Sequence, residues 1–129
     1  MNAREWERFD ELHAVSLIVY PVGAPEPQKG RDPHREYAKA FITAFPDLRF
    51  EEERGFGQGD WVAQTFAVTG THRGPLQMPG GREIPATNRP VRVKMGTVGK
   101  VEGGQITEEH HFWNVLDLLT QLGVAMGGN

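Results

Sequence analysis

The order of the elements that the sequence predicts constrains the fold more than any single motif: helices come first, and long extended segments follow. Apolar residues recur at helical spacing over residues 3–13, and a β-branched run over residues 15–20 predicts a short strand. Asp32 and Pro33 supply an N-cap and a first-turn proline for a second helix, which ends at Pro46. Both helices therefore precede most of the sheet.

Extended segments with turn signals between them fill most of the remaining chain. They span residues 48–56, 61–71, 91–101 and 105–113. Glycine-containing turns separate the first two segments and the last two, while residues 72–89 form a long loop rich in Pro and Gly. After a bend, a last helix continues to Gly123. Two helices followed by long antiparallel strands predict one α+β domain, residues 1–129, with the helices packed on one face of the sheet.

Charge and composition exclude several classes of function. The net charge is −3 and the 14 Lys and Arg residues are scattered, so the chain offers no basic surface to nucleic acid. The absence of cysteine excludes disulfides, thiolate nucleophiles and Cys-ligated metals. The longest apolar stretch, residues 14–20, is too short to span a membrane, and the first residues lack a signal pattern. We expect a cytoplasmic protein without a nucleic-acid or membrane partner.

The last predicted strand carries a high density of polar side chains. It opens at a Gly-Gly turn, and Glu108, His110, Phe112 and Asn114 share one face because side chains in a strand alternate with a period of two. A face with a carboxylate, an imidazole and an amide lies against water or against a polar pocket. Our hypothesis is that this face lines a pocket, in which case His111 points away from it.

Five short motifs occur in a fixed order along the chain. They are Phe45-Pro46-Asp47-Leu48-Arg49, Gln58-Gly59-Asp60-Trp61-Val62-Ala63, Gly70-Thr71-His72-Arg73-Gly74, Gly104-Gln105-Ile106-Thr107-Glu108-Glu109 and Gln121-Leu122-Gly123. In this order they resemble the SnoaL-like polyketide cyclases and ester cyclases of the NTF2-like superfamily. The resemblance covers nearly the whole chain. It implies an α+β cone, in which a strongly bent antiparallel sheet wraps around the N-terminal helices and leaves a central apolar pocket.

The resemblance also implies a reaction. Cyclases of this family bind an aromatic polyketide methyl ester and close its last ring by an intramolecular aldol reaction, without a metal or an organic cofactor. Their acid/base group is an aspartate at the end of the last strand, and that position is Asn114 in this chain. A tryptophan that precedes it in the family pattern is replaced by His110. The superfamily resemblance further implies pairing of two copies through the convex face of the sheet.

Replacement of the aspartate leaves the family reaction without its usual proton carrier. An amide neither accepts nor returns the proton α to a carbonyl, although Asn114 can hydrogen-bond a carbonyl or enolate oxygen. His110 is one substitute, because it shares the face of Asn114 and imidazole titrates near neutrality; the alternative is a half-exposed strand histidine bonded to a neighbour. Glu108 either orients that imidazole or pairs with a basic residue of the next strand. Asp117 is another substitute, with the alternative that it stabilises the N-terminus of the last helix.

The remaining histidines carry less functional signal. His72 ends a strand at the start of the long loop, where it either lines the pocket or holds a glycine-rich turn through backbone hydrogen bonds. His13 and His34 lie in amphipathic helices and are interpreted as surface or boundary residues. The pair His110 and His111 does not predict a metal site, because adjacent strand residues diverge and no spaced set of ligands completes it. We therefore expect no metal and no cofactor.

Aromatic and other large apolar residues are candidates for a ligand-binding surface. An ordinary core is the alternative for most of them, because the space between a sheet and its helices is filled by such residues in any case. The candidates for substrate binding are Tyr20, Tyr37, Phe41, Trp61, Phe66, Met95 and Phe112, and Phe45 belongs to the same group.

Three hypotheses about function follow. The first is a SnoaL-like protein that binds a small, apolar carbonyl compound and cyclises or isomerises it by cofactor-free acid/base chemistry, with His110, Asn114, His72 and Asp117 as candidate catalytic residues. The second is a ligand-binding protein without catalysis, since Asn114 replaces the aspartate. The third is an assembly module that forms a homodimer through the convex face of the sheet.

Overall fold

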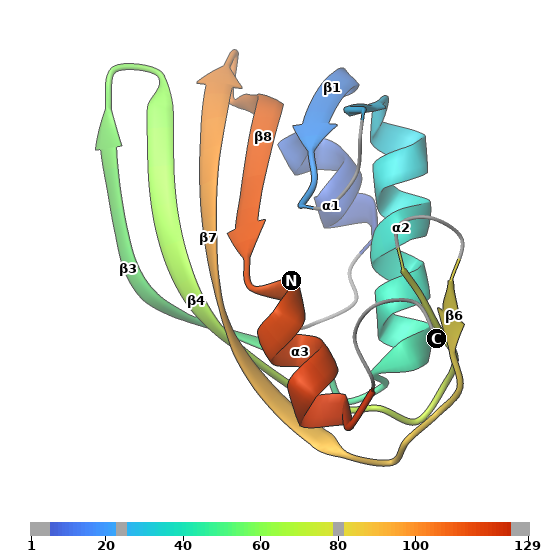
Figure 1. Cartoon of the computed structure of the whole chain (residues 1–129). Helices are drawn as coiled ribbons and strands as arrows, with labels where there is room; N and C mark the ends of the chain where they lie inside the picture. Colours follow the sequence, from blue (N-terminus) through green and yellow to red (C-terminus); the bar gives the residue numbers. More distant parts are fainter. Residues whose placement is uncertain (1–5, 23–25, 79–81, 125–129) are drawn as a thin grey trace.

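The computed structural model describes residues 6–22, 26–78 and 82–124 (Figure 1). Its elements in chain order are α1 (Trp6–Leu12), β1 (His13–Tyr20), β2 (Gln28–Lys29), α2 (Arg31–Ala44), β3 (Arg49–Gln58), β4 (Trp61–Thr71), β5 (Leu76–Gln77), β6 (Glu83–Ile84), β7 (Pro90–Glu102), β8 (Gln105–Trp113) and α3 (Val115–Leu122). The predicted succession of helix, strand, helix, four long strands and a last helix is confirmed.

Six strands form one sheet in the order β2-β1-β8-β7-β4-β3, and β5 pairs with β6 in a separate hairpin. The long hairpin partners β3 and β4 are antiparallel, as are β7 and β8. The expectation of a wholly antiparallel sheet is wrong at one pair, because β1 runs parallel to β8. Parallel strands require a crossover connection rather than a tight turn, and β1 is separated from β8 by α2 and all the other long strands.

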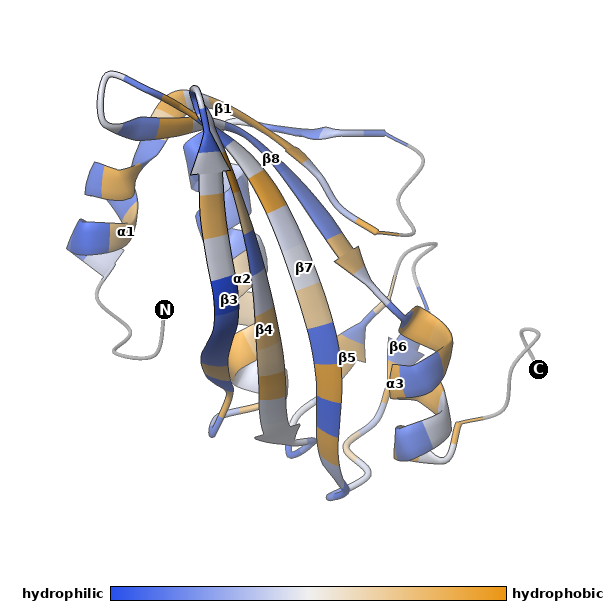
Figure 2. Ribbon diagram, turned by 90° about the vertical axis from the view of Figure 1, so that its left-hand side faces the viewer, coloured by the Kyte–Doolittle hydropathy of each residue, from blue (hydrophilic) through white to orange (hydrophobic). Residues whose placement is uncertain are grey.

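The sheet bends strongly, and α1 and α2 lie on the side towards which it curves, called here the concave face (Figure 1). Side chains on this face of β4 and β7 pack against the helices, as in the cross-strand pairs Phe66–Met95 and Val68–Val93. The residues between them, such as Lys94, point to the opposite, outer face. Figure 2 looks onto the sheet with α2 behind it and shows hydrophobic and hydrophilic residues alternating along β7.

The largest buried cluster closes one end of the molecule, where the C-terminus of α2 meets α3 and the β5–β6 hairpin. Each of its large apolar side chains stabilises the fold by roughly 1.5–3 kcal/mol when fully buried. The cluster consists of Ala44, Phe45, Leu48, Val68, Leu76, Met78, Ile84, Val91, Leu118, Leu119 and Leu122. Because α2 runs away from this cluster, its first turn lies at the other end of the concave face, where polar side chains gather.

The start of the second helix differs from the sequence prediction. Helix α2 has Gly30 as its N-cap rather than Asp32, and Gly30 adopts a positive φ of 103° while its N–H donates to the carbonyl of Leu17 at 2.6 Å. A backbone anchor to β1 therefore sets the start of the helix, and glycine accommodates that φ without a steric cost. The predicted first helix includes residues 3–5, which lie outside the described residues.

The predicted sequence of strand, bend and helix at the end of the chain is confirmed. Asn114 follows β8 and caps α3, with its Oδ1 accepting from the N–H of Asp117 at 2.9 Å. Gly123 ends α3 in the left-handed conformation at φ 73°. Among the described helices, none has the length and apolarity needed to cross a membrane.

Candidate functional site

The two faces of β8 carry different chemistry. His111 points to the concave face, where its ring lies 5.7 Å from that of His34 in α2. His110 points to the outer face, where its ring stacks on Tyr20 at 4.5 Å and lies 6.4 Å from the ring of Trp61. The predicted alternation is confirmed, but the interpretation that the face of His110 lines the interior is wrong. Alternation fixes which residues share a face, whereas the packing of α2 decides which face is inside.

Three rows of side chains cross the concave face of β4, β7 and β8. Apolar side chains give way to polar ones along the strands, from the closed end towards the first turn of α2. The rows are Phe66–Met95–Trp113, Gln64–Thr97–His111 and Val62–Gly99–Glu109. The polar rows therefore adjoin an aromatic wall.

A buried polar cluster forms at the last of these rows. It consists of His13 at the start of β1, His34 in the first turn of α2, and Glu109 and His111 of β8. His111 Nε2 lies 2.6 Å from Glu109 Oε1, and His13 Nε2 lies 3.7 Å from Glu109 Oε2. His13 and His34 are only 8% and 6% exposed. The interpretation of these two histidines as surface or boundary residues is wrong, because α1 covers them.

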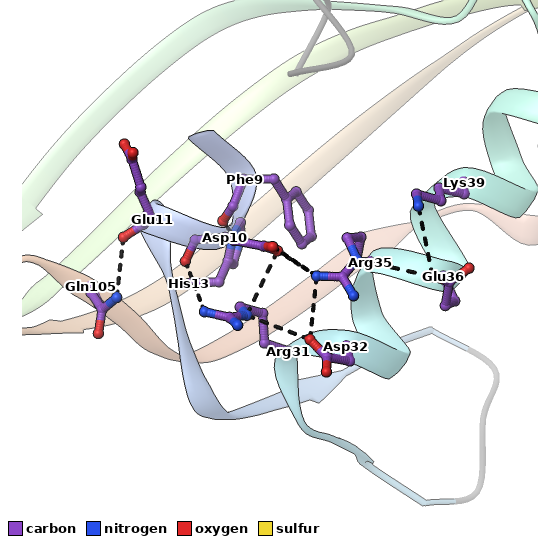
Figure 3. A network of polar contacts seen from close by, with 10 residues as sticks. All are labelled: Phe9, Asp10, Glu11, His13, Arg31, Asp32, Arg35, Glu36, Lys39 and Gln105. Carbon is purple, nitrogen blue, oxygen red and sulfur yellow. Dashed lines mark hydrogen bonds and ion pairs between the residues drawn. The ribbon is translucent and has the colours of Figure 1, made fainter. Parts of the chain in front are cut away.

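Contacts between α1 and α2 hold this cover in place (Figure 3). Arg35 donates to both carboxylate oxygens of Asp10 at 2.7 and 2.8 Å, and Arg31 donates to the carbonyl of Asp10 at 3.3 Å. Beneath them Phe9 stacks on His13 with ring centroids 4.2 Å apart. The first helix therefore excludes solvent from the histidines.

Burial and neighbouring charges shift the ionisation of the cluster. Burial alone would raise the pKa of Glu109, but the hydrogen bond from His111 and the nearby imidazoles of His13 and His34 hold it well below its ordinary value. Burial, together with the neighbouring His111 and His13, lowers the pKa of His34 to about 4, against the opposing effect of Glu109. Glu109 is therefore a carboxylate and His34 a neutral imidazole near neutral pH.

One ligand atom from each of His13, His34 and Glu109 lies within 4.8 Å of the other two. The sequence prediction that no spaced set of ligands forms is therefore wrong. Sequence spacing could not reveal the set, because its members come from β1, α2 and β8.

The four residues that the sequence singled out as catalytic candidates lie at three separate places. Asn114 and Asp117 are exposed neighbours at the N-terminus of α3, joined by the capping hydrogen bond. His110 is on the outer face. His72 is fully buried near Phe45, with Nδ1 3.0 Å from Thr87 Oγ1, and burial lowers its pKa.

The predicted substrate-binding residues also divide between the two faces. Tyr37, Phe41, Phe66 and Met95 lie on the concave side, where Tyr37 and Phe41 pack edge to face with ring centroids 5.1 Å apart. Tyr20, Trp61 and Phe112 lie on the outer side and are 40%, 38% and 57% exposed. Trp113 was missed by the sequence analysis, although the same alternation that places Phe112 outside places Trp113 against the core.

A shallow groove of about 510 Å³ crosses the outer face. Arg54, Thr65, Gly96 and Phe112 stand in register across four strands, and Gly96 leaves the middle of this row without a side chain. An ion pair of 3.8 Å between Lys94 and Glu53 lies at its margin. The groove is lined by Glu53, Arg54, Thr65, Lys94, Met95, Gly96 and Phe112.

Comparison with known proteins places the chain among related folds. The family model described as SnoaL-like polyketide cyclase matches residues 1–122. A proposed SnoaL-like polyketide cyclase from Jannaschia sp. CCS1 is 20% identical, with a TM-score of 0.83 over 95% of this chain and 81% of that one. IdmH from Streptomyces antibioticus, a proposed polyketide cyclase, is 26% identical, with a TM-score of 0.78 over 95% and 90% of the two chains.

A third structure identifies the architecture. A protein from Catenulispora acidiphila with a ketosteroid isomerase-like fold, solved with trimethylamine, is 17% identical, with a TM-score of 0.71 over 88% of this chain and 78% of that one. No curated protein matches the chain. The predicted α+β cone of the NTF2-like type is confirmed by these comparisons.

Proposed function

The chain belongs to the SnoaL-like polyketide cyclase family, and on that premise we propose that it binds a small, largely apolar carbonyl compound on its concave face and cyclises or isomerises it through an enolate. The observation that carries the proposal is the partly buried pair His111 and Glu109. It lies on the concave face, one row away from Trp113 and Met95. A proton-carrying pair beside an aromatic wall suits a carbonyl compound with an apolar body.

The geometry of the pair assigns the roles of its atoms. Glu109 is ionised, so Nε2 of His111 carries the hydrogen and donates to Oε1 at 2.6 Å. In a neutral imidazole the other nitrogen, Nδ1, then has the lone pair that accepts a proton. Glu109 acts as the positioning residue, because its hydrogen bond fixes the tautomer and the ring orientation.

Proton transfer then takes place in balanced steps. His111 Nδ1 takes a proton from the carbon α to the carbonyl, the C–H bond breaks, and its electron pair moves into an enolate. Thr97 is in register with His111 on β7, and in the proposed reaction its hydroxyl donates to the enolate oxygen. In a ring closure the enolate carbon attacks a second carbonyl and the alkoxide recovers the proton, whereas in an isomerisation the proton returns to another carbon.

The apolar wall supports the class of ligand. Phe66, Met95 and Trp113 are partly buried on the sheet side, and Phe41 faces them from α2. Half-buried aromatic side chains bury much additional apolar area when a planar ligand covers them. Similarity to IdmH, described as a proposed polyketide cyclase, supports a polyketide-like ligand.

A second candidate function is ligand binding without chemistry. Asn114 stands at the position of the family aspartate, is exposed, and uses its side-chain oxygen to cap α3. The side chain of Asn114 therefore has a structural role as the N-cap of α3. Under this reading the concave face holds a ligand that the protein does not transform.

The experiment compares three variants on a panel of polyketide-like β-keto methyl esters. His111→Gln removes the proton acceptor, His110→Gln changes the adjacent histidine on the outer face, and Asn114→Asp restores the family aspartate. Turnover is followed by mass spectrometry. Binding is followed by intrinsic tryptophan fluorescence, to which Trp113 on the concave face contributes. We expect His111→Gln to lower turnover by about 10²- to 10⁴-fold with little loss of binding, and His110→Gln to change neither.

Each other outcome decides against part of the proposal. Turnover that survives His111→Gln would refute the role of the pair. Turnover that appears only in Asn114→Asp, with binding in the native protein, would support the binding function. Absence of both binding and turnover across the panel would contradict a carbonyl ligand of this class.

We further propose that two copies pair through the outer face. Phe56 is 70% exposed and Phe112 57% exposed on this face, which Tyr20 and Trp61 share. Extended exposed apolar surface of this kind is typical of association surfaces when it forms a contiguous patch. Analytical ultracentrifugation of the native chain and of Phe112→Ser tests the pairing: we expect a dimer that the variant weakens, and a monomer at high concentration would contradict it.

A further inference from the structure

We propose that His13, His34 and Glu109 bind one divalent transition-metal cation, with Zn²⁺ as the reference ion. The inference does not rest on the proposed function, because metal binding is measured without substrate. Its basis is the convergence of three ligand atoms from three elements, all within 4.8 Å of one another. Two imidazoles and one carboxylate are a ligand set that Zn²⁺ and other first-row divalent ions prefer.

Outer hydrogen bonds occupy one ring nitrogen of each histidine and leave the other free. His13 Nδ1 lies 2.7 Å from the carbonyl of Phe9, which only accepts, so this nitrogen carries the hydrogen and Nε2 is left with a lone pair. His34 Nδ1 lies 3.2 Å from Oε1 of Gln28, which likewise accepts, so its Nε2 is also left with a lone pair. Metal-binding histidines typically donate their second nitrogen to an oxygen in this way.

The carboxylate has the same arrangement. Glu109 Oε1 accepts from His111, while Oε2 is buried and has no hydrogen-bond partner among the described residues. A buried carboxylate oxygen without a partner costs free energy. Each of the three side chains thus has one atom occupied by an outer partner and one atom left for a ligand.

The distance between two of the free atoms fits two ligands of one metal ion better than it fits a hydrogen bond. His13 Nε2 and Glu109 Oε2 are 3.7 Å apart. A charge-assisted N–H···O bond is shorter, about 2.7–2.9 Å. Two ligands of a tetrahedral ion with bonds of about 2.1 Å lie about 3.4 Å apart, which is closer to the observed separation. All three ligand atoms lie within 4.8 Å of one another, so binding requires side-chain movements of about 1 Å rather than a change of fold.

The site has the character of an open rather than a closed metal centre. Three protein ligands leave at least one position for water or for an oxygen of a bound molecule. His111, bonded to the other oxygen of Glu109, would be an outer partner of the site and keep its own contact with the concave face. Metal binding and proton transfer would therefore share Glu109.

The outer face of β8 provides a matched control for the test. His110 and Glu108 are bonded at 2.7 Å with nearly the same geometry, but they lack the converging histidines. The whole protein is stripped with a chelator and titrated with Zn²⁺ by calorimetry. Co²⁺ is titrated in parallel, and its visible absorption reports the coordination number. The variants are His34→Gln, Glu109→Gln, His110→Gln and Glu108→Gln.

We expect one Zn²⁺ per chain, a rise in Tm on addition of Zn²⁺, and at least a 10-fold weaker affinity in His34→Gln and Glu109→Gln. The two outer-face variants should bind like the native chain. Sub-stoichiometric binding by the native chain, or affinity lost in His110→Gln but kept in His34→Gln, would overturn the proposal. Titration and the Co²⁺ spectrum of the native chain decide the question even where a variant fails to fold.

The two proposals fail separately. His111→Gln should lower turnover by about 10²- to 10⁴-fold and still bind one Zn²⁺ per chain, more tightly than Glu109→Gln, because His111 contacts Oε1 of Glu109 and is not itself a ligand of the proposed ion. If turnover is unchanged after chelation, the proton-transfer role of His111 and Glu109 is supported and does not require the metal. Zn²⁺ binding without any turnover would support the metal site alone.

Discussion

Strand β8 contains the same pair of residues twice, once on each face of the sheet. On the outer face His110 and Glu108 are bonded at 2.7 Å, and their side chains are 31% and 34% exposed. On the concave face His111 and Glu109 are bonded at 2.6 Å, and theirs are 10% and 15% exposed. The two pairs have nearly equal hydrogen-bond lengths but unequal burial. Their different reactivity is therefore expected to come from their surroundings rather than from residue type or spacing.

The surroundings differ in two physical respects. The outer pair stacks on Tyr20 beside solvent, where the attraction between charges is weak. The inner pair lies under α1 and next to His13 and His34, in a region of low dielectric constant where charges and lone pairs interact strongly. Substitutions that change one face of β8 at a time test this difference.

The largest effect is expected from the two aromatic neighbours at the end of β8. Trp113 packs against the core, while Phe112 is 57% exposed. Trp113→Ala should lower the free energy of unfolding by about 3 kcal/mol, and Phe112→Ala by less than about 0.5 kcal/mol. Urea unfolding of both variants measures the difference, and equal losses would mean that the faces have been assigned the wrong way round.

A smaller difference is expected from the two carboxylates. Glu109→Ala removes the acceptor for His111 from a buried site and should cost about 2 kcal/mol of unfolding free energy. Glu108→Ala removes a half-exposed partner and should cost less than about 0.5 kcal/mol. Thermal and urea unfolding check both values. A Glu109→Ala protein as stable as the native chain would show that the cluster is strained in its metal-free form.

The smallest effect is expected where β8 leaves the sheet. Asn114→Ala removes the cap of α3 and should cost about 1 kcal/mol, whereas Asn114→Asp keeps an acceptor and should stay within about 0.5 kcal/mol of native. Circular dichroism during urea unfolding checks both variants. A large loss in Asn114→Asp would indicate a contact of the amide beyond the cap.

Local signals in the sequence were sufficient for most of the fold. The hairpin turns, the alternation along β8, and the change from strand to helix at Asn114 each depend on a few adjacent residues. The family resemblance added the architecture, which the comparisons confirm. Among the substrate-binding candidates, Tyr37 and Phe41 of α2, Phe66 of β4 and Met95 of β7 lie on the concave side, where the helical or strand periodicity points to the core. Trp61, at the start of β4, lies on the outer side.

Long-range packing decided what the sequence could not. Periodicity put His110 and His111 on opposite faces, but it contains no information about which face α2 would cover. His13 and His34 looked like isolated residues of amphipathic segments, and only the parallel pairing of β1 with β8 and the docking of α2 bring them to Glu109.

Local sequence patterns thus specify the elements, their order and the relative orientation of neighbouring side chains. The tertiary structure alone decided which of two equivalent His–Glu pairs became buried and which distant histidines joined it. Backbone geometry depends on adjacent residues, so the local sequence pattern predicts it. Burial depends on elements that are far apart in the chain and meet only after folding.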